Sequence, residues 1–147
     1  MTTKLFTIGF TKWSAEGFFE TIKREQVRRV IDVRLNNKSQ LAGFAKTNDL
    51  KYFLNQICEV EYVHVVDLAP TEDMLSAYRS KKIPWGAYEK EFLSLIAQRE
   101  IERRLPRDLF EGGCLLCSEK EPHFCHRRLV VEYLKNKWDI PLQVKHL

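Results

Sequence analysis

The chain has 147 residues, of which 44% are hydrophobic and 12% aromatic, and it carries a formal net charge of +4. This composition predicts one domain with a real hydrophobic core over residues 1–147, and it excludes a disordered chain. Because no apolar run approaches the roughly 20 residues of a membrane-spanning helix and the N-terminal sequence lacks a signal-peptide pattern, we expect a cytoplasmic protein with no membrane partner and with reduced cysteines.

The first predicted elements are a strand, a helix and a second strand. The run KLFTIGF (4–10) is rich in residues that favour strands. Ser14 suits the N-cap of a helix that continues to Gln26 and buries an apolar stripe. The run RRVIDVR (28–34) then predicts the second strand.

The middle of the chain predicts two further helices around a third strand. A helix is expected near residues 47–57, with Thr47 or Asn48 as its N-cap. The run VEYVHVVDL (60–68) predicts the third strand. Another helix opens in APTEDMLSAY, where Pro70 suits a helix start and the acidic residues suit the positive end of the helix dipole.

The last part of the chain completes an alternating pattern. The segment 83–105 predicts one long helix, 112–119 a fourth strand, 125–138 the last helix and 141–147 a closing strand. Strands that alternate with helices predict a mostly parallel sheet covered by helices. We therefore expect an α/β fold, a single-domain three-layer sandwich of about five strands with helices on both faces.

Ligands of an open parallel sheet bind outside the carboxyl ends of its strands. Gly9 and Thr11 follow the first predicted strand, and Asp32 and Arg34 end the second. Strands buried on both faces should be almost wholly apolar, so Asp32 and Arg34 are out of place unless they are paired. The sequence leaves two interpretations open, a structural ion pair and a ligand-binding or catalytic role.

Cys114 and Cys117 have C-x2-C spacing, but the predicted strand separates them. Three residues along a strand place the two Cα atoms about 10 Å apart with side chains on opposite faces. A disulfide needs Cα atoms closer than roughly 7 Å, and a metal needs converging ligands. We therefore predict that Cys114 is a buried core thiol and that Cys117 faces the site, together with Glu119.

Cys125 falls at or just before the first turn of the last predicted helix. The N–H groups and the positive dipole end there stabilise an anion, either a thiolate or a bound phosphate. His126 and Arg127 add positive charge, and an electropositive, partly exposed site makes a cysteine nucleophilic. The alternative interpretation is that Cys125 packs inward.

Zinc is the less favoured cofactor hypothesis. Cys117, His123, Cys125 and His126 offer suitable ligand types, but their C-x5-H-x-C-H spacing matches none of the common zinc patterns. The three tryptophans are expected as core or rim aromatics, because nothing around them in the sequence makes a stacking platform; they are Trp13, Trp85 and Trp138.

Taken together, these features resemble the family of domains of unknown function numbered 488. The resemblance runs nearly end to end. It rests on TIGF (7–10), VIDVR (30–34), Ser39, Phe44, LAPT (68–71), CLLCSE (114–119) and CHRRLVVEYL (125–134). It implies an α/β domain with its signature residues at one edge of the sheet, and no particular reaction. The signature falls on Asp32, Arg34, Cys117, Glu119, Cys125, His126 and Arg127.

The chain also departs from the family pattern at three places. Many members read Gly-His-Ser where this chain has Gly9-Phe10-Thr11, carry a basic residue where Gln40 stands, and read Gly-Gly where Ala69-Pro70 stands. These departures imply a subgroup with its own ligand.

The leading hypothesis is an enzyme-like pocket that binds a small anionic ligand, phosphorylated or nucleotide-like. In it Cys125 is the candidate thiolate, and Glu119 and Asp32 are candidate acid–base or orienting carboxylates. The candidate ligand-binding residues are Arg34, His126, Arg127, Gly9, Thr11 and Cys117. Two alternatives stay open: a non-catalytic module for a nucleotide or nucleic acid, and a purely structural ion-pair cluster. Nucleic acid is not favoured, because charges of both signs are interspersed along the chain.

Overall fold

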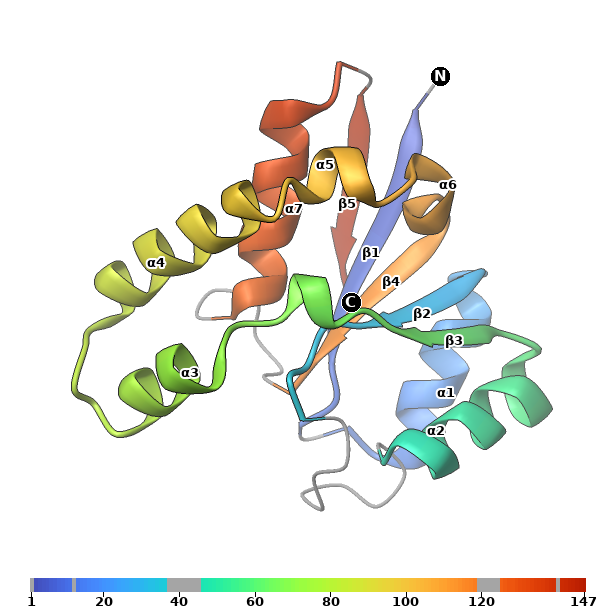
Figure 1. Ribbon diagram of the computed structural model, residues 1–147. Helices are drawn as coiled ribbons and strands as arrows, with labels where there is room; N and C mark the ends of the chain where they lie inside the picture. Colours follow the sequence, from blue (N-terminus) through green and yellow to red (C-terminus); the bar gives the residue numbers. More distant parts are fainter. Residues whose placement is uncertain (1, 12, 37–45, 119–124, 140) are drawn as a thin grey trace.

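A computed structural model of the chain describes all residues except 1, 12, 37–45, 119–124 and 140. Five strands form one sheet in which every neighbouring pair runs parallel, in the order β3-β2-β4-β1-β5 (Figure 1). The strands are β1 (Thr3–Gly9), β2 (Arg29–Asp32), β3 (Glu61–His64), β4 (Gly113–Cys117) and β5 (Leu142–His146). Because all of them are parallel, their carboxyl ends lie at one edge of the sheet.

Helices cover both faces of this sheet (Figure 1). They are α1 (Ala15–Arg24), α2 (Thr47–Phe53), α3 (Glu72–Arg79), α4 (Trp85–Gln98), α5 (Ile101–Arg104), α6 (Arg107–Phe110) and α7 (His126–Lys137). The apolar side chains of α1 and α2 pack in one core cluster, and those of α4 and α7 pack in another. The expected α/β class, a parallel sheet between two helical layers, is confirmed. Within the described residues, each helix is too short or too polar to cross a membrane.

The strand β4 passes between the two core clusters. All five of its residues are buried, and successive side chains point to opposite faces. Cys114 packs in the cluster with α1 and α2, whereas Cys117 packs in the cluster with α4 and α7. Burial raises the pKa of the Cys114 thiol far above its usual value, so it stays protonated. The predicted separation of the two cysteines is confirmed.

The N-cap residue predicted from the sequence is correct for α1 and wrong for α2. The Ser14 hydroxyl accepts a hydrogen bond from the Gly17 amide, as its predicted capping role requires. The expected cap of α2 at Thr47 or Asn48 is wrong by one or two residues. The chain leaves its extended conformation at Lys46, which is the N-cap, and the helix continues as a π-helical turn over Leu54–Cys58.

The third strand is shorter than predicted. It ends at His64, and Val66–Leu68 forms a 3-10 turn. In a strand, Val66 and Leu68 would share one face; the turn instead leaves Val66 49% exposed and buries Leu68 completely. Burial of one apolar side chain at the expense of the other therefore explains the early end of β3.

The single long helix expected over residues 83–105 is broken. It ends at Gln98, and Glu100 takes a left-handed conformation with φ 53° before α5 begins. The break is held by Arg99, whose Nη1 donates to the carbonyls of Asp67 at 2.8 Å and Ala69 at 2.7 Å. These are contacts with the turn after β3, and no glycine or proline marks the position in the sequence.

Candidate functional site

A cavity of about 480 Å³ opens at the carboxyl ends of β1, β2 and β4. This is the edge at which a parallel sheet is expected to bind ligands. Besides aliphatic and neutral polar residues, three kinds of side chain line it: cationic, sulfur or imidazole, and aromatic. The residues of these kinds are Arg34, Arg79, Cys117, Cys125, His126, Tyr78, Trp85 and Tyr88.

Asp32 and Arg34 form a buried ion pair at the end of β2. The guanidinium donates from Nε to Oδ1 at 2.9 Å and from Nη2 to Oδ2 at 2.7 Å, so the contact has two points. The hydroxyl of Tyr62 donates to the same Oδ2 at 2.6 Å, and the ring of Phe10 lies 5.2 Å from the Arg34 guanidinium carbon. Asp32 is completely buried, and its geometry is that of a carboxylate that orients Arg34 in the cavity wall.

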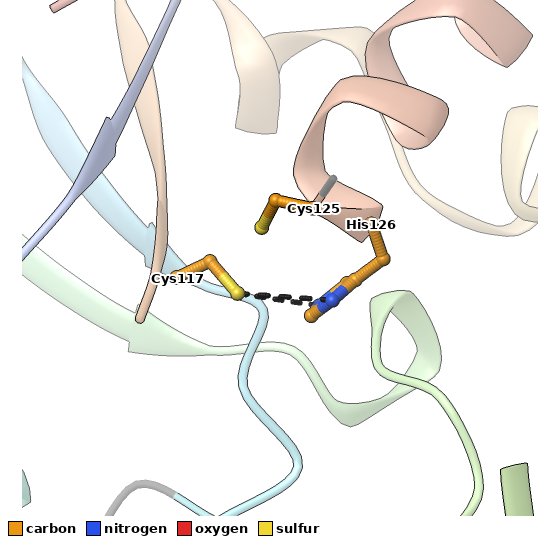
Figure 2. Close-up of side chains that lie close together, drawn as sticks. All are labelled: Cys117, Cys125 and His126. Carbon is orange, nitrogen blue, oxygen red and sulfur yellow. Dashed lines mark hydrogen bonds between the residues drawn. The ribbon is translucent and has the colours of Figure 1, made fainter. Parts of the chain in front are cut away.

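Cys117, Cys125 and His126 converge at the inner part of the cavity, and we call them the thiol–imidazole cluster. Cys117 comes from the end of β4, and the other two come from the start of α7 (Figure 2). One donor atom from each residue lies within 4.8 Å of the other two. The Cys117 sulfur is 3.7 Å from Nδ1 of His126 and 3.9 Å from Nε2. Each of these residues is at most 6% exposed, and all three line the cavity.

One hydrogen bond fixes the His126 ring. Its Nε2 lies 2.7 Å from the carbonyl oxygen of Val33. A carbonyl oxygen can only accept, so Nε2 donates its N–H to Val33. The Cys117 sulfur lies at nearly equal distances from the two ring nitrogens, 3.7 Å from Nδ1 and 3.9 Å from Nε2. The second strand, through the residue after Asp32, therefore orients the imidazole that faces the thiols.

The two thiols of the cluster differ in acidity. The hydrogen bond from Cys125 lowers the pKa of Cys117, against the opposing effect of burial and with help from the charge of Arg127. Burial raises the pKa of Cys125, as does the bond that it donates to Cys117. Cys117 is therefore the more acidic thiol of the pair.

An aromatic wall closes the cavity on the side of α3 and α4. The rings of Trp85 and Tyr88 stack with centroids 5.3 Å apart and an interplanar angle of 27°. Tyr78 from α3 packs against both, with centroids 5.5 Å from Trp85 and 5.0 Å from Tyr88. All three rings line the same cavity as the thiol–imidazole cluster.

The comparisons with known proteins agree with the resemblance noted in the sequence. The model of a family described as domain of unknown function DUF488 matches residues 14–134. The chain belongs to this family. No curated protein and no solved structure matches the chain. The DUF488 match spans the ion pair, the aromatic wall and the thiol–imidazole cluster, so all three lie within the family domain.

The structure of this DUF488 chain brings together most of the residues singled out in its sequence. Arg34, Thr11, Cys117, Cys125 and His126 line the cavity. In the strand register, Gly9 lies opposite Cys117, and the Thr11 amide donates to the carbonyl of Ser118. Glu119 and His123 lie outside the described residues.

Two predicted features differ from the structure. Cys125 is 3% exposed rather than partly exposed; it is the N-cap residue of α7, but its thiol makes no capping bond to the described residues of that helix and packs inward. Arg127 is completely buried and is not among the described residues that line the cavity. It acts on the site through its charge, which favours the Cys117 thiolate.

Sequence reasoning missed the aromatic wall and Arg79. Trp85 was expected only as a core or rim residue, yet it lines the cavity. Trp85 and Tyr88 are three residues apart on α4, and Pro84 directly before them breaks the chain between α3 and α4. Aromatic residues on both sides of such a break were the one available signal, because they must meet when the two helices pack together.

Proposed function

We propose that this DUF488 protein binds a small anionic ligand, phosphorylated or nucleotide-like, in the cavity and acts on it through its cysteines. One observation carries the proposal: a buried arginine, an aromatic wall and a thiol–imidazole cluster line the same cavity. Each feature has a structural explanation by itself. Their convergence at the carboxyl edge of a parallel sheet is typical of a ligand site.

The charge of the cavity wall favours an anion. Among the described lining residues, Arg34 and Arg79 are cations, and none is an aspartate or a glutamate. A guanidinium matches the geometry of phosphate and carboxylate oxygens. Two hydrogen bonds to the Asp32 carboxylate fix the Arg34 guanidinium in position before a ligand binds.

The size and the aromatic wall favour a ligand with a flat ring. A cavity of about 480 Å³ suits a small molecule. Trp85 lines the cavity and is partly exposed, whereas Tyr88 behind it is 2% exposed. A nucleobase can therefore stack on the indole ring, and such stacking contributes roughly 1–3 kcal/mol per base. The phosphate of a mononucleotide would then contact Arg34 and Arg79.

The cysteines supply the reactive group of the proposal. Cys117 is the more acidic thiol, because the hydrogen bond from Cys125 lowers its pKa, and the His126 ring lies beside it, with Nδ1 3.7 Å from the sulfur. Asp32 serves as the orienting carboxylate. The part of Glu119 stays a prediction.

Thermal shift and calorimetric titration with adenosine monophosphate test this proposal. We expect the wild-type melting temperature to rise with ligand, and Arg79→Gln to weaken binding about tenfold or more, because a bond to a charged group is lost. Arg24→Gln is the matched control, since Arg24 is exposed on α1 at the other face of the sheet. An equal response of all three proteins, or no response to any phosphorylated compound, would overturn the proposal. Tighter binding of an oligonucleotide, falling steeply with salt, would favour the nucleic-acid alternative instead.

A further inference from the structure

We propose that Cys117, Cys125 and His126 bind a zinc ion at the inner end of the cavity, with a fourth coordination position open toward the ligand. The inference names what the cysteines of the site do. It rests on the proposed function for the role of the metal, and on the geometry of the cluster for its place.

The distances within the cluster fit a tetrahedral ion. Zinc binds thiolate sulfur at about 2.3 Å and imidazole nitrogen at about 2.0–2.1 Å, which places the two donor atoms roughly 3.6 Å apart. The Cys117 sulfur is 3.7 Å from Nδ1 of His126 and 3.9 Å from Nε2, so the imidazole must turn about its bond to Val33 to direct Nδ1 at a shared ion. One donor atom from each of the three residues lies within 4.8 Å of the others, against roughly 3.6–3.8 Å around zinc, so a movement of about 1 Å closes the site.

The His126 ring is already held as a metal ligand needs to be held. A zinc-bound histidine almost always donates its other ring N–H to a carboxylate, a water or a backbone carbonyl. Here Nε2 donates to the Val33 carbonyl at 2.7 Å, which leaves Nδ1 as the ring nitrogen available to a metal. Val33 follows β2, whereas Cys117 ends β4 and Cys125 precedes α7, so this bond is an independent feature of the fold.

Cys125 is available as the third donor. It occupies the N-cap position of α7 without capping that helix, so its sulfur is directed into the cluster rather than to the helix amides. None of the three ligands is more than 6% exposed, so two thiolates alone would be costly to bury. A divalent ion neutralises their two charges and offsets that cost. Sulfur and nitrogen donors without oxygen favour zinc over magnesium or calcium.

The ligand number gives the site its function. Structural zinc sites are closed by four protein ligands, whereas three ligands leave a position for water or substrate. All three proposed ligands line the cavity that also contains Arg34. The open position therefore faces the space in which the anion would bind, and a zinc ion there would hold a water of lowered pKa or an oxygen of the ligand itself.

Titration of the full chain with metal alone tests the inference. The reduced protein is stripped with a chelator and titrated with Co²⁺ and, separately, with Zn²⁺. We expect one equivalent to bind, with a thiolate-to-cobalt charge-transfer band in the near ultraviolet, strong tetrahedral d–d bands, and displacement of Co²⁺ by Zn²⁺. In wild-type protein, Zn²⁺ should raise the melting temperature and the chelator should lower it.

Ligand variants and one matched control complete the experiment. Cys117→Ser, Cys125→Ser and His126→Gln should each weaken metal binding by more than the roughly 10- to 100-fold cost of losing an outer-shell partner. Cys58→Ser should bind like wild type, because Cys58 packs on the other face of the sheet and donates to the Phe19 carbonyl. Far-ultraviolet circular dichroism checks that each variant is folded.

The outcomes separate this inference from the proposed function. A wild-type protein without the charge-transfer band, or with a band that survives in both cysteine variants, overturns the zinc site. If adenosine monophosphate still raises the melting temperature in that case, the ligand pocket stands without a metal. If the cobalt bands appear but no phosphorylated compound raises the melting temperature, the metal site stands and the proposed ligand pocket does not.

Discussion

The His126 ring is hydrogen-bonded through Nε2 to the backbone carbonyl of Val33, 93 residues earlier in the chain, at 2.7 Å. This bond joins the start of α7 to the end of β2 and holds the imidazole beside the Cys117 sulfur, which lies 3.7 Å from Nδ1 and 3.9 Å from Nε2. The orientation of the cluster therefore depends on the sheet edge and on the last helix together. Substitutions at His126 can separate these two roles.

We predict that His126→Asn destabilises the metal-free protein more than His126→Gln. The amide of glutamine reaches the position of Nε2 and can still donate to Val33, whereas asparagine is too short. The Asn variant then leaves a buried carbonyl without its donor, which costs about 1–3 kcal/mol. Urea unfolding measures both variants. Equal stability of the two would contradict the structural role of the bond to Val33.

The buried pair of Asp32 and Arg34 should contribute far more to stability than a surface pair. Asp32→Ala leaves the Arg34 charge buried and should cost about 3–5 kcal/mol. The control is Glu61→Ala, which breaks the surface pair between Arg29 and Glu61, where the contact is 3.1 Å and the glutamate side chain is 63% exposed. That loss should stay below about 1 kcal/mol. Similar free energies of unfolding for the two variants would show that the buried pair does not hold the edge of the sheet.

The four cysteines should differ in their rate of alkylation. In metal-free protein, iodoacetamide should modify Cys117 first, because the pKa of Cys117 lies below its usual value while burial raises those of Cys58, Cys114 and Cys125. The advantage of Cys117 over Cys58 should widen as the pH falls from 9 toward 7, since its thiolate persists to lower pH. Peptide mass spectrometry gives the four rates. Faster modification of Cys125 would instead support the nucleophile that the sequence suggested.

The aromatic wall predicts a preference for a base over phosphate alone. Adenosine monophosphate should bind wild-type protein about tenfold tighter than inorganic phosphate, as stacking of one base allows. Trp85→Ala should remove most of this difference and leave the affinity for phosphate nearly unchanged. Calorimetric titration of wild type and Trp85→Ala, each with adenosine monophosphate and with inorganic phosphate, measures the four affinities. A preference that persists without the indole would place the base elsewhere.

The sequence predicted those parts of the site that depend on strand geometry. Alternation along β4 separates Cys114 from Cys117 whatever surrounds the strand, and parallel strands bring the ends of β2 and β4 to one edge. The departure of Asp32 and Arg34 from an apolar strand left an ion pair and a ligand-binding or catalytic role open, and the structure shows the pair.

The parts that could not be predicted depend on how helices pack. The inward rotation of Cys125 follows from the face of α7 that meets the sheet, and the aromatic wall exists only where α3 meets α4. The break at Glu100 is held by bonds from Arg99 to a turn thirty residues earlier. None of these contacts leaves a periodic signal in the local sequence.

The central claim is that an anionic ligand and the thiol–imidazole cluster share one cavity. The most direct test is the alkylation rate of Cys117 in metal-free protein, with and without saturating adenosine monophosphate, with Cys58 as the internal reference. We predict that the nucleotide slows modification of Cys117 and leaves the rate of Cys58 unchanged. A nucleotide that binds without protecting Cys117 would contradict the account.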